Sequence, residues 1–209
     1  MEINKVYNMD CLDYMRTLPD KCIDLVLTDP PYWIWFDNKI RDKKINTWDK
    51  EIPSKEYFDE MIRISKNQII WGANYFPYLW VDWCRWFIFW NKDVNFWTYS
   101  AWELAWTSFN RPANYFYWAW NWLADWIRWR NKKEKIEHPT VKPKELFKWC
   151  LENYSEKWMT IFDPFAWSWT TAVACIETWR NYIVVEKEPK YCEIINKRIA
   201  STTPPLFVM

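Results

Sequence analysis

The chain has a single glycine, Gly72, among 209 residues, but it has 21 tryptophans. At an ordinary usage of about 7%, a chain of this length would hold about 15 glycines. Globular proteins need residues with positive φ in turns and after helix ends, and glycine supplies most of them. The deficit raises the question of which residues occupy those positions here.

Histidine and paired cysteines are also scarce. The one histidine, His138, excludes a multi-histidine metal site, and we expect it to be structural. No CxxC pair occurs, which favours reduced, packed thiols over disulfides or zinc ligands. The six cysteines are Cys11, Cys22, Cys84, Cys150, Cys175 and Cys192.

Long apolar runs are absent too. None approaches the roughly 18–20 residues of a membrane span. The polar start, MEINKVYNMD, lacks the apolar centre of a signal peptide, so we predict a cytoplasmic protein. The net charge of +1 neither favours nor excludes a nucleic-acid partner, and the length suits one well-buried domain with a small insertion.

Short apolar runs alternate with amphipathic segments, a pattern that predicts an α/β sheet. Helices are expected to begin near residues 53, 140, 170 and 189. Strands are expected at 23–29, 67–72, 87–90, 103–109, 159–163 and 181–186. The predicted organisation is a catalytic half at 1–109, an aromatic and basic insertion at 110–137, a second half at 138–200 and a tail at 201–209.

The tetrapeptide DPPY, Asp29–Tyr32, ends the first predicted strand. Open α/β sheets bind ligands at the carboxyl ends of their strands. There the Asp29 carboxylate and the Pro30 carbonyl are two acceptors, and the Tyr32 ring is a stacking surface. This set suits the exocyclic amino group of a planar base, whose nitrogen lone pair becomes more nucleophilic when both N–H groups are hydrogen-bonded. The alternative is an ordinary Pro-Pro turn.

A second segment, FDPFAWSWTT at 162–171, lies between a predicted strand and a predicted helix. With glycine in place of Trp167 and Trp169 it would have the pattern of a nucleotide-cofactor loop. Glu186 follows 17 residues after Trp169, at the end of the next strand, where an acidic side chain can accept hydrogen bonds from a ribose diol. The alternative is a βαβ unit without a ligand.

Five motifs in this order resemble those of the DNA methyltransferases that modify amino groups, in their β-type order with the catalytic motif before the cofactor motif. The motifs are NMDC (8–11), DPPY (29–32), IIWGANYF (69–76), HPTVKP (138–143) and the loop at 163–171. The resemblance implies a Rossmann-like, mostly parallel seven-stranded sheet with one antiparallel strand. It further implies helices on both faces and a target-recognition insertion.

The resemblance also implies roles for individual residues. The target base would be flipped out of double-stranded DNA, stacked on Tyr32 and methylated without a metal. The implied catalytic residues are Asp29, Pro30, Pro31 and Tyr32. The implied binding residues for S-adenosylmethionine are Asp10, Thr140, Lys142, Asp163, Pro164, Phe165, Ala166, Trp167, Ser168, Trp169, Thr170 and Glu186.

Two basic clusters are candidate phosphate contacts beside the pocket, although such clusters are also common in solvated loops. Their residues are Lys39, Arg41, Lys43, Lys44, Arg128, Arg130, Lys132 and Lys133. The resemblance places such an enzyme in a bacterium or a phage-infected cell, within restriction-modification. A homodimer and a restriction endonuclease counterpart are left open.

The DPPY motif favours adenine N6 over cytosine N4, for which SPPY is more usual in the family. No Pro-Cys nucleophile is present for carbon-5 cytosine methylation. Two alternatives stay open: a cytosine-N4 methyltransferase, and a non-catalytic, aromatic-rich nucleic-acid-binding protein. Methyl transfer from a labelled donor to unmethylated DNA would distinguish the enzyme from the binding protein.

Several tryptophans occupy positions that are glycine in the family, namely Trp33, Trp35, Trp167, Trp169 and Trp179. We hypothesise that a codon written here as tryptophan, such as a reassigned UGA, is read as glycine in the source organism. If the tryptophans are real, their side chains would obstruct the cofactor loop. The chain as written would then bind S-adenosylmethionine poorly, and ordinary UGG codons at these positions would refute the reassignment.

Overall fold

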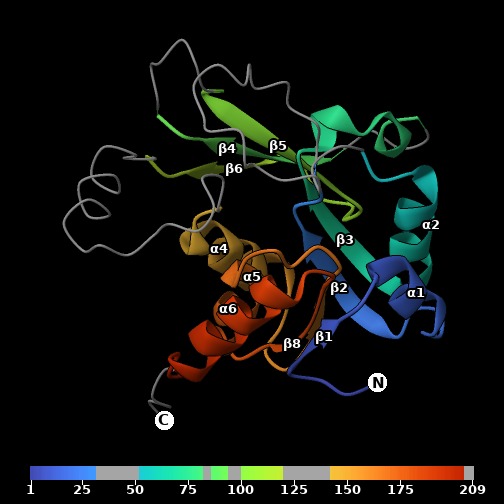
Figure 1. The fold of residues 1–209 in the computed structure, drawn as a ribbon. Helices are drawn as coiled ribbons and strands as arrows, with labels where there is room; N and C mark the ends of the chain where they lie inside the picture. Colours follow the sequence, from blue (N-terminus) through green and yellow to red (C-terminus); the bar gives the residue numbers. More distant parts are fainter. Residues whose placement is uncertain (32–51, 82–85, 94–99, 120–141, 205–209) are drawn as a thin grey trace, which may run out of the picture.

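A computed structural model describes residues 1–31, 52–81, 86–93, 100–119 and 142–204 (Figure 1). The described strands form one mixed sheet of eight, in the order β1-β8-β7-β2-β3-β5-β4-β6. β5 is antiparallel to both neighbours, whereas the other pairs are parallel. The strands are β1 (Lys5–Asn8), β2 (Ile23–Thr28), β3 (Ser65–Trp71), β4 (Phe87–Asn91), β5 (Trp102–Thr107), β6 (Asn114–Tyr117), β7 (Thr160–Asp163) and β8 (Asn181–Glu186).

The predicted α/β class and the single antiparallel strand are confirmed, and each of the six predicted strands is present within two residues of its expected bounds. Within the part of the chain that the structure describes, the sheet has eight strands rather than seven. β6 forms its edge and lies inside the range 110–137 that was predicted as an insertion, so the start of that range belongs to the sheet. β1 at the other edge was not predicted, because only two of its four residues are partly buried.

Helices cover both faces of the sheet (Figure 1). The helices α1 and α2 pack on one face, and α4, α5 and α6 pack on the other. Short 3₁₀ turns η1 (Ala73–Tyr75) and η2 (Pro77–Leu79) follow β3. The helices are α1 (Cys11–Arg16), α2 (Lys55–Ile64), α4 (Lys144–Tyr154), α5 (Thr170–Glu177) and α6 (Pro189–Ala200).

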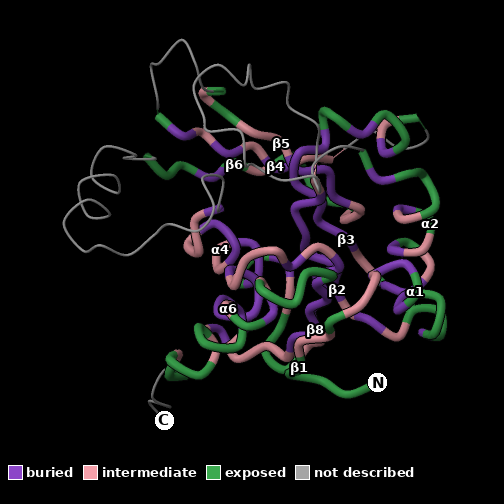
Figure 2. The backbone as a smooth tube through the Cα atoms, viewed as in Figure 1, coloured by how far each residue is buried: buried purple, intermediate pink, exposed green. Residues whose placement is uncertain are grey.

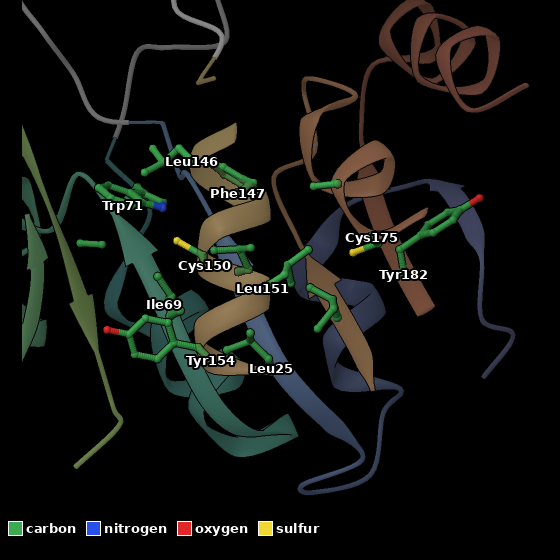
Figure 3. Close-up of a cluster of buried hydrophobic side chains, with 14 of the residues drawn as sticks. Leu25, Ile69, Trp71, Leu146, Phe147, Cys150, Leu151, Tyr154, Cys175 and Tyr182 are labelled. Carbon is green, nitrogen blue, oxygen red and sulfur yellow. The ribbon is translucent and has the colours of Figure 1, made fainter. Parts of the chain in front are cut away.

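The larger core lies between the sheet and α4–α6. In Figure 3, the Cys150 sulfur of α4 points toward β3, which carries Ile69 and Trp71, and Leu25 of β2 belongs to the same buried cluster. The central strands β2 and β3 are almost entirely buried, as the purple tube in Figure 2 shows, whereas the outer side of α6 is exposed. Burial on both faces explains why β2 is a nearly continuous apolar run.

The end of α5 has the geometry of a Schellman motif, with Trp179 at the C′ position. The Trp179 N–H donates to Ile176 O at 3.4 Å, and the Arg180 N–H donates to Cys175 O at 2.9 Å. Trp179 has φ 61°, in the left-handed region that glycine usually occupies at this position. Trp158 also has a positive φ, of 69°.

By contrast, Trp71, Trp90 and Trp106 lie in the core with at most 7% exposure, as large apolar side chains ordinarily do. Five cysteines lie in the described residues, and all are free thiols: Cys11, Cys22, Cys150, Cys175 and Cys192.

Candidate active site

The candidate site is the edge of the sheet where the parallel strands end. Asp29 follows β2, Asp163 is the last residue of β7, and Glu186 is the last residue of β8. Because β2, β7 and β8 are adjacent and parallel, their carboxyl ends meet at one edge. The structure therefore brings together the three acidic residues that the sequence placed after separate apolar runs.

Asp29 forms a buried ion pair with Lys142. Lys142 Nζ lies 2.8 Å from each carboxylate oxygen of Asp29, and the two residues are 7% and 4% exposed. Lys142 immediately precedes Pro143, the N-cap residue of α4. The resemblance implies that Lys142 binds the cofactor; in the structure its ammonium contacts Asp29.

The ion pair continues into the β4–β5 hairpin. Lys142 Nζ also lies 3.0 Å from Glu103 Oε2, and Glu103 Oε1 is paired with Lys92 Nζ. We call Asp29, Lys142, Glu103 and Lys92 the buried charge cluster. Its two carboxylates and two ammonium groups balance in charge, which limits the cost of burying them.

Burial raises the pKa of Asp29 above its usual range. Lys142 opposes this effect by attracting the carboxylate, and the negative charge of Glu103 reinforces it. Burial alone would also raise the pKa of Glu103, but Lys142 and Lys92 together hold it below its ordinary value. Asp29 is therefore a carboxylate with an increased affinity for a proton, held in place by a cation.

Asp163 fastens the adjoining loop. Its Oδ1 accepts hydrogen bonds from the Thr28 hydroxyl at 2.6 Å and from the Phe165 N–H at 3.1 Å. Its Oδ2 accepts one from the Thr171 hydroxyl. Burial raises the pKa of Asp163 to about 6 although these donors favour the ionised form. Its side chain thus ties β7 to β2 and α5.

The predicted cofactor loop turns closely around the end of β8. The Ala166 N–H donates to Val185 O at 3.0 Å, and Ala166 is 1% exposed. Neither Trp167 nor Trp169 is among the described residues with positive φ. The Trp169 indole packs against the larger core and lies 5.4 Å from the Arg198 guanidinium.

The loop is also joined to the residues that hold Asp29. The Ser168 hydroxyl donates to Thr170 Oγ1 at 3.1 Å, and the Thr170 hydroxyl donates to Lys142 O at 3.4 Å. The residue that pairs with Asp29 is thus bonded to the start of α5.

Glu186 is 8% exposed, and its Oε1 accepts a hydrogen bond from the Glu188 N–H at 2.6 Å. Burial raises its pKa to about 7. The predicted Asp10 caps α1 through a bond from the Leu12 N–H at 2.9 Å, and its other oxygen lies 3.5 Å from Lys187 Nζ.

Several predicted residues lie outside the described part of the chain, and their prediction is unchanged. They are the stacking residue Tyr32, the cofactor residue Thr140, the tryptophans Trp33 and Trp35, and all eight predicted DNA contacts at 39–44 and 128–133. Pro30, Pro31 and Pro164 lie where the two motifs place them, directly after β2 and β7.

Sequence reasoning missed Lys92, Glu103 and Thr28. A signal was present: Lys92 and Glu103 are opposite charges at the facing ends of two apolar strands that form a hairpin. Within the described residues no cluster of His, Cys, Asp and Glu could hold a metal ion. None of the described helices is long and apolar enough to cross a membrane.

Comparison with known proteins finds similarity between this chain and DNA methyltransferases. The sequence model of the N6_N4_Mtase family, described as DNA methylase, matches residues 117–197. The type II methyltransferase M2.MboI of Moraxella bovis is 25% identical over 249 residues, which cover 96% of this chain and 89% of the relative. The type II methyltransferase M.HinfI of Haemophilus influenzae is 24% identical, with 97% and 70% covered.

Solved structures show the same fold. The cytosine-N4-specific PvuII DNA methyltransferase superposes with a TM-score of 0.64 at 16% identity, covering 93% of this chain and 85% of that one. The M1.HpyAVI–SAM complex superposes with a TM-score of 0.59 at 22% identity, covering 93% and 98%.

Proposed function

We propose that this chain, which belongs to the family of DNA methylases that modify adenine N6 or cytosine N4, methylates the N6 amino group of adenine in DNA. The observation that carries the proposal is the buried Asp29 carboxylate at the carboxyl end of β2, followed by Pro30 and beside the loop after β7. The preference for adenine rests on Asp at the first position of the motif.

Asp29 and Pro30 would act on the target amino group directly. A carboxylate oxygen and a carbonyl oxygen can each accept one N–H of an exocyclic –NH₂. Both bonds direct the nitrogen lone pair away from the ring. Lys142 bridges the two oxygens of Asp29 but leaves lone pairs available, since a carboxylate has about four acceptor sites. The raised pKa of Asp29 suits it to receive the proton that the nitrogen loses.

S-adenosylmethionine fits the adjoining edge. A buried carboxylate with a pKa of about 7 is short of donors, and the hydroxyls of a ribose diol would supply two to Glu186. When bound, S-adenosylmethionine supplies the electrophilic methyl group. The loop at 163–170 would lie against it, with Asp163 holding the loop in shape through Thr28 and Thr171.

Double-stranded DNA is the proposed substrate, with the target base flipped toward Asp29 because the amino group is inaccessible inside a duplex. Tyr32 would stack on the flipped base, and the basic clusters would contact phosphates. A cytoplasmic site of action belongs to this proposal, whereas a restriction endonuclease counterpart and a homodimer stay open.

The test is product identification. The chain, and a version with glycine at positions 33, 35, 167, 169 and 179, would be incubated with labelled donor and unmethylated DNA, and the nucleosides would be separated by mass spectrometry. N6-methyladenine would support the proposal. N4-methylcytosine would replace adenine by cytosine as the target, and DNA left unmodified by both versions would contradict methyl transfer.

A further inference from the structure

Two charged residues lie one step beyond the pair formed by Asp29 and Lys142. Glu103 Oε2 is 3.0 Å from Lys142 Nζ, so Lys142 contacts both Asp29 and Glu103. Glu103 Oε1 pairs with Lys92 Nζ. Charges therefore alternate from Asp29 through Lys142 and Glu103 to Lys92.

The β4–β5 hairpin fixes the far end of this series. Trp90 is the register partner of Glu103, and the Lys92 N–H donates to Ala101 O at 3.0 Å. The Lys92 ammonium lies 4.9 Å from the centre of the Trp90 ring, and Lys92 is 5% exposed. Glu103 and Lys92 are thus held in place by the backbone pairing of the hairpin and by packing against Trp90.

Joining a hairpin to the rest of the sheet through four buried charges carries a large desolvation cost. Apolar residues of similar volume often give equal or greater stability in such places. Packing alone does not account for Glu103 and Lys92, and their link to Asp29 suggests an electrostatic role.

We propose that Glu103 and Lys92 are positioning residues that set the strength of Asp29 as a hydrogen-bond and proton acceptor, acting through Lys142. The inference rests on the proposed function, because it assumes that Asp29 receives the target amino group. Lys142 holds the Asp29 carboxylate in place, but its positive charge also weakens that carboxylate as an acceptor. Glu103 offsets this effect because its negative charge contacts the same ammonium group. Lys92 in turn partly neutralises Glu103.

Among the described residues, Asp163 is a further ionisable group near Asp29. Burial and, to a smaller extent, the negative charge of Asp29 raise the pKa of Asp163, whereas the hydrogen bonds that its oxygens accept from Thr28, Thr171 and the Phe165 N–H lower it. It is common to every variant considered below, so differences between the variants report on Glu103 and Lys92.

The direct test is titration of the Asp29 carboxyl by carbon-13 NMR in the full chain labelled at aspartate, with Asp29→Asn to assign the resonance. Glu103→Gln keeps the size of the side chain and removes its charge, and we expect the Asp29 midpoint to fall by about one pH unit. Lys92→Met keeps the stem against Trp90, and the midpoint should rise by a similar amount. The double variant restores the charge balance and should return the midpoint close to the parent value.

Methyl transfer gives the second readout. Glu103→Gln should lower kcat about tenfold, with KM for DNA nearly unchanged, and the double variant should recover most of the loss. Glu193→Gln, an exposed site on α6, is the control for charge.

The positioning role would be overturned if the titration midpoint of Asp29 is unchanged in both single variants. It would also be overturned if the losses in kcat of the two single variants add in the double variant. If Glu103→Gln does not fold, the test is the shift of the Asp29 midpoint in Lys92→Met, which should be a rise. No methyl transfer by either the parent or its glycine-restored version would overturn the proposed function, whatever the NMR shows. Transfer by the parent with unmoved Asp29 resonances would overturn only this inference.

Discussion

Replacing Glu186 by Gln should stabilise the cofactor-free chain while weakening its hold on the cofactor. Glutamine keeps a carbonyl oxygen for the Glu188 N–H and removes the buried charge. The pKa of Glu186 is raised by burial from an ordinary 4.5 to about 7. The folded chain therefore binds this proton more tightly than the unfolded chain does, and the stability it contributes falls as the pH rises from about 4.5 through about 7.

The gap of about 2.5 pH units sets the size of the effect. At roughly 1.4 kcal/mol per unit, the ionised carboxylate costs at most about 3 kcal/mol at pH 8. At pH 5 the same relation leaves about 1 kcal/mol, because most of the residue is protonated in the folded chain. The gain from Glu186→Gln should shrink accordingly.

Urea denaturation at pH 8 and pH 5 measures this gain, with the exposed Glu193→Gln as the control for a change of net charge. The midpoint of Glu186→Gln should exceed that of the parent clearly at pH 8 and slightly at pH 5. A variant that is less stable than the parent at pH 8, or a gain that is equal at both values, would refute the reasoning.

Three further outcomes are expected. The affinity for S-adenosylmethionine, measured by calorimetry, should strengthen by up to about tenfold between pH 6 and pH 8 as Glu186 ionises, and Glu186→Gln should lose that dependence; a parallel profile in both would contradict the ribose role. Trp179→Gly should raise the free energy of unfolding by about 1 kcal/mol, because glycine has no penalty at φ 61°; a loss of stability in urea would argue against it. Thr171→Val removes a donor from buried Asp163, so the pKa of Asp163 should rise further above about 6 and the chain should lose about 1–3 kcal/mol at pH 8, measured by the same denaturation; unchanged stability would contradict the bond.

The sequence predicted those parts of the fold that have a strong local pattern. β2 and β8 are apolar runs, and the acidic residues Asp29 and Glu186 at their carboxyl ends predicted a shared edge, where the structure brings them together. β1 and β6 were missed because each is four residues long at an edge of the sheet and has little continuous burial.

The ion pairs could not be predicted, because they depend on contacts between distant residues. Lys142 and Asp29 are 113 positions apart, and nothing in HPTVKP indicates that the lysine reaches the DPPY carboxylate. Glu103 and Lys92 are close in sequence, yet their relation to Asp29 arises only when β5 pairs with β3 and the β4–β5 hairpin reaches the carboxyl edge.

The position of Trp179 was predictable for the opposite reason. A helix end has a local geometry, and the residue after it is usually glycine whatever the tertiary structure. The left-handed backbone at Trp179 agrees with the hypothesis that this position is glycine in the source organism.

The central claim is that the Asp29 carboxylate holds the target amino group during methyl transfer. The most direct measurement is the single-turnover rate of Asp29→Ala in the glycine-restored chain, with cofactor affinity measured on the same preparation. We predict a loss of about 10²- to 10⁴-fold in rate. An Asp29→Ala variant that methylates DNA at the parent rate would contradict the claim.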